Sequence, residues 1–208
     1  MVAVLNKSDP KTSTSTSTST VTSTTTSPAS STAPGGLKYT IADYVRENKI
    51  TETPVHHGDP GSPTINLPVP QGWNLINESA GAPYGGIVFA QPADPNDPPT
   101  IVALVAKLTG TVDQAKLLEY APGELQNLPG YQGSGAGTAS TLGGFNAWQL
   151  SGTYEKGGKK RAVAQKTVII PSGDAVFVLQ LNADSLESEQ GPLMDATNVI
   201  DEQTTISL

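Results

Sequence analysis

The stretch "FNAWQLSGTYEK" (145–156), followed by "RAVAQKTVIIP" (161–171) and "AVFVLQLNAD" (175–184), decides the fold of this chain. Successive side chains alternate in character within each segment, and an alternation with a period of two is typical of strands in a sheet. The loop "EKGGKKR" (155–161) has the length and the glycines of a hairpin turn between the first two segments. We therefore predict that the three segments form consecutive antiparallel strands.

Helices and further strands are expected on both sides of these three strands. Thr40 can cap a short helix at its N-terminus, and helical spacing over 111–128 is interrupted by Pro122, which predicts a kink or two short helices. A terminal helix is predicted within 192–206, and strands are expected at 64–67, 73–76, 85–90 and 100–108. The sum predicts an α+β fold in which an antiparallel β-sheet is flanked by helices.

The N-terminal segment differs in composition from the rest. Most positions from Thr12 to Thr32 are Ser or Thr, and such a segment buries too little apolar surface to offset the entropy lost on ordering. We predict that residues 1–36 are a disordered Ser/Thr-rich tether and that residues 37–208 form a single ligand-binding domain. A glycosylated stalk and a segment without function are the alternatives.

The composition limits the classes of partner and of chemistry. The chain has 208 residues and a formal net charge of −7, and its largest basic cluster is Lys159–Arg161. Nucleic-acid binding needs a basic surface, so no nucleic-acid partner is expected. The chain has no cysteine, which excludes disulfides, thiolate metal sites and thiol catalysis.

Both histidines lie in "TPVHHGDPGSPTINLPVP" (53–70), where Asp59 closely follows His56 and His57. Adjacent side chains of an extended chain point to opposite sides, and no other His or Cys is present to complete a zinc site. Asp59 could orient a histidine as a general base near Ser62, but Asp-Pro-Gly-Ser-Pro is typical of tandem turns. We predict a rigid loop and no metal site.

No motif for catalysis or phosphate binding is complete. "GSGAGTAS" (133–140) has Thr138 where a dinucleotide fingerprint needs its third glycine. No serine lies within Gly-x-Ser-x-Gly, and no nucleophile–base pair can be named. We expect neither enzymatic activity nor a cofactor.

Aromatic residues in or beside the predicted strands are candidates for the walls of a binding cleft. Trp and Tyr combine a large apolar body with a polar tip, which suits a ligand that is part sugar and part hydrocarbon. The alternative is that the two Trp residues belong to the core. The candidates are Trp73, Tyr84, Tyr131, Phe145 and Trp148.

The stretches "ETPVHHGDPGSPTINLPVP" (52–70), "APYGGIVFAQPADPNDPPTIVALVAKLTG" (82–110) and "TLGGFNAWQLSG" (141–152) resemble the Lpp-LpqN family of mycobacterial cell-envelope lipoproteins. The likeness extends over residues 38–208. It implies a PsbP-like α/β sandwich, and a lipidated N-terminal cysteine that this sequence lacks. The start at Met1 then indicates a mature form without its lipid, and the Ser/Thr-rich segment becomes the tether between membrane and domain.

The resemblance also implies a function at the periplasmic face of the plasma membrane, with part of the protein secreted. The family is linked to trehalose-type glycolipids related to mycolic acid and to membrane lipid exporters. We expect a non-enzymatic glycolipid-binding protein that assists envelope lipid transport. The candidate contacts to the headgroup of the glycolipid are His56, His57 and Asp59. The alternative is a protein-interaction adaptor in the envelope or at the interface with a host protein.

Overall fold

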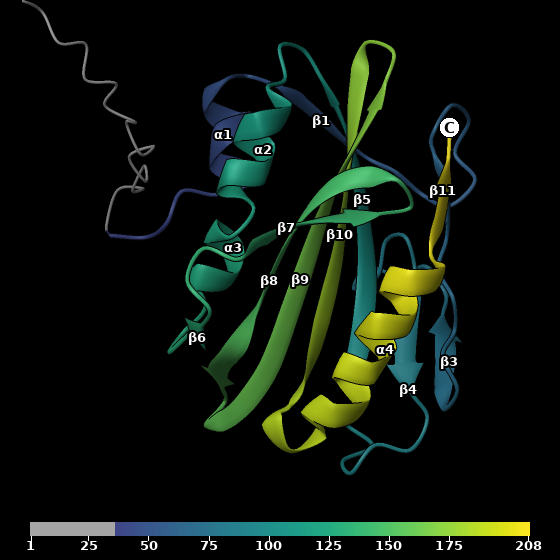
Figure 1. Ribbon diagram of the computed structural model, residues 1–208, viewed down its shortest axis with the longest axis vertical. Coiled ribbons are helices and arrows are strands. Elements are labelled where there is room, and N and C mark those ends of the chain that lie inside the picture. The colour runs from purple at the N-terminus through teal and green to yellow at the C-terminus, as the bar shows by residue number, and fades with distance from the viewer. Residues whose placement is uncertain (1–35) are drawn as a thin grey trace, which may run out of the picture. The chain divides into compact units, whose positions relative to one another are not determined.

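The strands predicted at 145–184 form the centre of a nine-stranded antiparallel sheet in the computed structural model, which describes residues 36–208 (Figure 1). They are β8 (Phe145–Lys156), β9 (Lys159–Ser172) and β10 (Ala175–Leu186). Gly157 and Gly158 join β8 to β9 with φ angles of 59° and 75°, as a tight hairpin turn requires. Residues 1–35 of the predicted tether lie outside the part of the chain that the structure describes.

The remaining strands extend this centre on both sides. The sheet runs in the order β3-β4-β5-β10-β9-β8-β6. In addition, β1 pairs with residues 106–109 of β5, whereas β4 pairs with residues 100–102 of the same strand. In the same way, β7 pairs with residues 145–149 of β8, whereas β6 pairs with residues 152–153. A separate two-stranded sheet joins β2 to β11. The bounds are β1 (Thr51–Pro54), β2 (Thr64–Asn66), β3 (Trp73–Ile76), β4 (Gly86–Phe89), β5 (Thr100–Thr109), β6 (Gln132–Gly133), β7 (Thr138–Leu142) and β11 (Thr205–Ser207).

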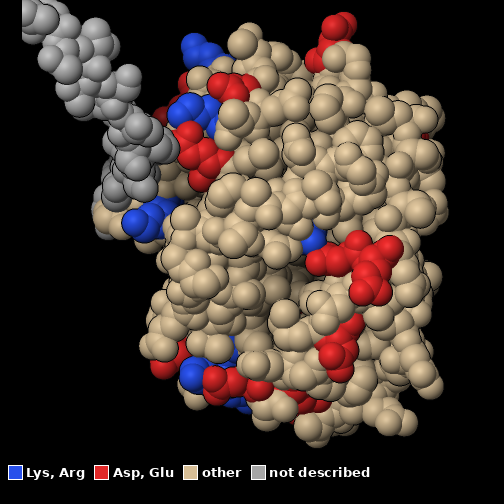
Figure 2. Space-filling view, viewed as in Figure 1, with Lys and Arg blue, Asp and Glu red and all other residues tan. Residues whose placement is uncertain are grey.

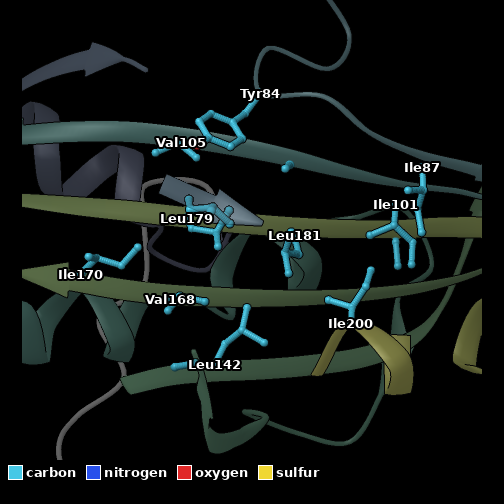
Figure 3. Close-up of a cluster of buried hydrophobic side chains, with 14 of the residues drawn as sticks. Tyr84, Ile87, Ile101, Val105, Leu142, Val168, Ile170, Leu179, Leu181 and Ile200 are labelled. Carbon is cyan, nitrogen blue, oxygen red and sulfur yellow. The ribbon is translucent and has the colours of Figure 1, made fainter. Parts of the chain in front are cut away.

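Helices cover both faces of the sheet. On one face, buried residues of α1 (Ile41–Glu47) and α2 (Gln114–Tyr120) pack against β5, β9 and β10. On the other face, α4 (Gln190–Gln203) packs its buried side against the main core, where Figure 3 shows Ile200 beside Ile101 and Leu181. This arrangement confirms the predicted α+β class.

The local predictions for two helices are also confirmed. The hydroxyl of Thr40 accepts a hydrogen bond from the backbone N–H of Asp43, whose carboxylate accepts one from Thr40 N–H, so that α1 begins with a capping box. Pro122 separates α2 from α3 (Gly123–Gln126), which gives the two short helices expected there. No helix of residues 36–208 is both long and apolar enough to span a membrane.

The terminal helix is held at both ends. A short 3₁₀ turn, Glu187–Glu189, connects it directly to β10. After α4 the chain continues into β11, which pairs with β2. The helix is therefore fixed against the sheet from each of its ends.

A buried arginine holds the proline-rich turn at 93–99 against the end of β9. Arg161 Nη1 donates to both carboxylate oxygens of Asp97 at 2.8 Å, and Nε donates to Asp184 Oδ1 at 2.7 Å. Tyr154 Oη donates to the other oxygen of Asp184 at 2.5 Å, and burial raises the pKa of this phenol to about 12. Each buried polar group of this cluster thus has a charged partner.

Candidate functional site

A cleft of about 320 Å³ lies between α4 and the sheet. Figure 2 shows a hollow on this face, with one basic group and several acidic groups along one edge. The strands β8, β9 and β10 supply most of its floor, α4 supplies one wall, and the β6–β7 segment supplies the opposite rim.

Small side chains create the space at the floor of the cleft. Ser151, Ala164 and Ala183 are direct neighbours in register on β8, β9 and β10, and Ile101 of β5 continues the same row. Because these three neighbouring side chains are short, they leave a space between the sheet and α4. Leu181 and Ile200 add apolar surface, and the register pair Gln149 and Lys166 adds polar groups to the same floor.

The rim opposite α4 is a glycine-rich segment held close to β8. Trp148 Nε1 donates to Ala136 O at 2.7 Å, and Gln126 Nε2 donates to Gly135 O at 3.0 Å. Gly137 has a φ of +83°, and a Cβ there would lie 2.4 Å from Gln149 O. Only glycine fits this close approach, so the segment that fails as a phosphate loop is instead the rim of a cleft.

Two charged residues line the cleft, Lys166 and Asp201. Lys166 Nζ lies 2.6 Å from Asp201 Oδ1 and donates to Ser140 Oγ at 3.2 Å. The other polar residues of the lining are neutral: Ser134, Thr138, Gln149, Ser151, Gln165, Thr197 and Asn198. The lining of the cleft thus combines apolar side chains, neutral polar groups and one ion pair.

A second pocket, of about 370 Å³, lies beside the histidine loop. Its lining includes His57, Tyr84 and Glu78. Glu78 Oε1 accepts from the backbone N–H of His57 at 2.8 Å, and Oε2 lies 3.2 Å from His56 Nδ1. Glu78 thus connects the loop to the turn after β3, and Leu75, 63% exposed, lies on the border of the pocket.

The histidine loop has the tandem turns predicted for it. The carboxylate of Asp59 accepts from the backbone N–H of His56 at 2.8 Å, and Ser62 N–H and Oγ both donate to Asp59 O. Gly58 and Gly61 have positive φ angles. Asp59 therefore has a structural role in the loop.

The structure does not bring the candidate aromatic residues together around one cleft. Trp73 is buried in the core against Phe89, with ring centroids 5.5 Å apart, and Phe145 packs against the same core. Tyr84 lies in the second pocket beside His57. Tyr131 and Trp148 are near the rim of the main cleft.

Those last two aromatics position the rim. Tyr131 Oη donates to Ser151 O at 2.9 Å, and Trp148 Nε1 holds the glycine-rich segment. Most residues that line the cleft are small, aliphatic or amide side chains, which residue type alone does not distinguish from ordinary strand residues. One signal was available: Lys166 interrupts an otherwise apolar face of β9, between Ala164 and Val168.

Among the described residues, no group of three His, Cys, Asp or Glu side chains could hold a metal ion.

The comparisons place the chain in a family. Residues 37–207 match the Lpp-LpqN family, described as "Probable lipoprotein LpqN". Lipoprotein LpqN of Mycobacterium tuberculosis is 72% identical over 172 residues, which cover 83% of this chain and 75% of that protein. The chain therefore belongs to the Lpp-LpqN family of probable lipoproteins.

A solved structure agrees with this assignment. The crystal structure of LpqN "involved in cell envelope biogenesis of Mycobacterium tuberculosis" has a TM-score of 0.81 and 72% sequence identity, and the match covers 82% of this chain and 98% of that chain. The resemblance seen in the sequence is thus confirmed.

Proposed function

We propose that this protein is a non-enzymatic lipoprotein of the cell envelope that binds trehalose-type glycolipids related to mycolic acid. The observation that carries the proposal is the cleft under α4, whose lining combines apolar side chains with neutral polar groups and the Lys166–Asp201 pair. This mixed lining matches a ligand that is sugar at one end and hydrocarbon at the other.

The size of the cleft limits what enters it. Sites for small molecules enclose roughly 300–1,000 Å³, and this cleft, at about 320 Å³, is at the lower end of that range. It accommodates a sugar headgroup with the first part of one acyl chain. The rest of a long lipid remains outside, where a membrane or a transporter can hold it.

The family supports the proposed location and partners of the protein. A relative of 72% identity is described as involved in cell envelope biogenesis, and a lipid-anchored domain at the periplasmic face of the plasma membrane suits a carrier. In this proposal residues 37–208 are the single ligand-binding domain, residues 1–36 are its tether, and a membrane lipid exporter supplies or receives the lipid.

The second pocket supports a second candidate function. Leu75 and Val69 are 63% and 47% exposed, and Leu75 borders the pocket that contains His57 and Tyr84. Of these two residues Leu75 lines the pocket, where an apolar group of a protein partner could contact it. An adaptor role in the envelope or toward a host protein would use this surface.

Native mass spectrometry with 6-O-octanoyl trehalose tests the glycolipid proposal. We expect one bound ester per chain, and we expect Asn198→Trp, which places a large ring in the cleft, to weaken that binding at least about tenfold by steric exclusion. Gln203→Trp is the matched control, because Gln203 is an exposed neutral residue of the same helix outside the cleft lining. Equal binding by both variants would locate the ligand elsewhere, and no binding by the parent chain would favour the adaptor role.

A further inference from the structure

Lys166 has an unusual position for a lysine. It lies in the middle of β9, on the face covered by α4, and its side chain is 8% exposed. Its ammonium reaches Asp201 of α4 and Ser140 of β7. Three elements that border the cleft thus meet at one charged group.

The lysine is the buried partner of this ion pair, since the side chain of Asp201 is 38% exposed. Desolvation of a buried charge offsets part of the attraction to its partner, so an ion pair of this kind is a weak source of stability. Lys160 on the same strand illustrates the contrast: it pairs with Glu187 at 2.7 Å while half of its side chain remains in water. The buried position of Lys166 places its charge in the lining of the cleft.

Hydrogen-bonding capacity remains at both partners. A lysine ammonium has three N–H donors, and those of Lys166 have two partners within the described residues, Asp201 and Ser140. Asp201 Oδ1 faces the ammonium, and Asp201 accepts no further hydrogen bond from residues 36–208. One ammonium donor of Lys166 and the second carboxylate oxygen of Asp201 thus have no partner within the described residues, and both side chains line the cleft.

We propose that the Lys166–Asp201 pair reads the headgroup of the bound amphiphile and selects an uncharged, hydroxyl-rich one. A hydroxyl both donates and accepts, so two neighbouring sugar hydroxyls match an N–H donor beside a carboxylate acceptor. An anionic headgroup meets the Asp201 carboxylate, and a cationic one meets the ammonium, so like charges disfavour both. The inference rests on the proposed function and adds the residues that give it specificity.

The test measures the affinity of three probes that share an eight-carbon chain, by isothermal titration calorimetry. The probes are 6-O-octanoyl trehalose, octyl phosphate and octyl tetraethylene glycol. We expect Lys166→Met to weaken binding of the trehalose ester about tenfold or more and to change binding of the glycol ether less than about twofold. Asp201→Asn removes the repelling charge and is expected to strengthen binding of octyl phosphate about tenfold.

Lys160→Met is the matched control, because Lys160 lies on the same strand, has its own carboxylate partner and does not line the cleft. It is expected to leave all three affinities unchanged. Far-UV circular dichroism confirms that each variant is folded, and Asp201, whose side chain is 38% exposed, provides a variant with little risk to folding.

The possible outcomes distinguish a failure of the Lys166–Asp201 proposal from a failure of the proposed function. If both variants keep the parent's affinities, or if Lys166→Met weakens all three probes alike, the pair does not read the headgroup, while the proposed function stands. If the folded parent chain binds none of the probes, the proposed function fails and this inference fails with it.

Discussion

Replacement of Arg161 by alanine is expected to destabilise the domain strongly. The Arg161 side chain is 7% exposed, and it neutralises Asp97 and Asp184, which are 26% and 27% exposed. Removing one partner of a buried ion pair costs about 3–5 kcal/mol, because a charge is left without compensation. Since both carboxylates keep some contact with water, we expect the lower end, about 3 kcal/mol.

Urea and thermal unfolding, followed by tryptophan fluorescence and circular dichroism, measure this loss. For a domain of this size about 3 kcal/mol corresponds to a fall of about 6–12 °C in Tm. Arg46→Ala is the matched control: Arg46 also pairs with a carboxylate, Asp43 at 2.5 Å, but it is 68% exposed. We expect the control to lose less than about 1 kcal/mol.

The pH dependence of the unfolding free energy provides a second measurement of the Arg161–Asp97 interaction. Hydrogen bonds from Arg161 hold the pKa of Asp97 below its ordinary value of 3.8. The stability that this lowered pKa contributes is present above pH 3.8 and is lost as the pH falls through the lower pKa of the folded state. The difference between parent and Arg161→Ala should therefore shrink in acid. The reasoning would be refuted if Arg161→Ala lost no more unfolding free energy than Arg46→Ala, or if its loss did not change as the pH is lowered.

Two further predictions concern the binding surfaces. Gly137→Ala is expected to displace the rim and to weaken binding of 6-O-octanoyl trehalose several-fold in calorimetry. Gly135→Ala is the control, because a Cβ at Gly135 would meet no atom within 4 Å, and it should weaken binding less; equal losses of affinity would exclude the close approach at Gly137 as the cause. His57→Ala should leave Tm within about 2 °C, because the side chain is exposed, and should keep the one bound ester in native mass spectra, because His57 lines the second pocket and not the cleft under α4. Loss of that ester would place the ligand in the second pocket.

The central strands could be predicted because their pattern is local. In β8, β9 and β10 each residue's face follows from its position in an alternating run, and two glycines mark the hairpin. β1 was missed because all four of its residues are exposed and Pro54 ends it, and β11 because three residues give too little pattern. Their pairing depends on strands far away in the chain.

The location of the cleft could not be predicted from residue type. It results from the register that aligns Ser151, Ala164 and Ala183 across three strands, and a single sequence does not show that alignment. Large aromatic residues attract attention as ligand contacts, yet Trp73 fills the core and Trp148 positions a rim. Lys166, in an apolar strand face, was the clearest available signal.

The pairing of β11 with β2 has a kinetic consequence. Because α4 is joined to β10 at one end and to the small sheet at the other, we expect a ligand to exchange without a hinged opening of this helix. Side-chain rotations, which take picoseconds to nanoseconds at exposed positions, are the motions expected to accompany its entry. Association then proceeds in one step, with an observed rate that rises linearly with ligand concentration and shows no slower isomerisation phase.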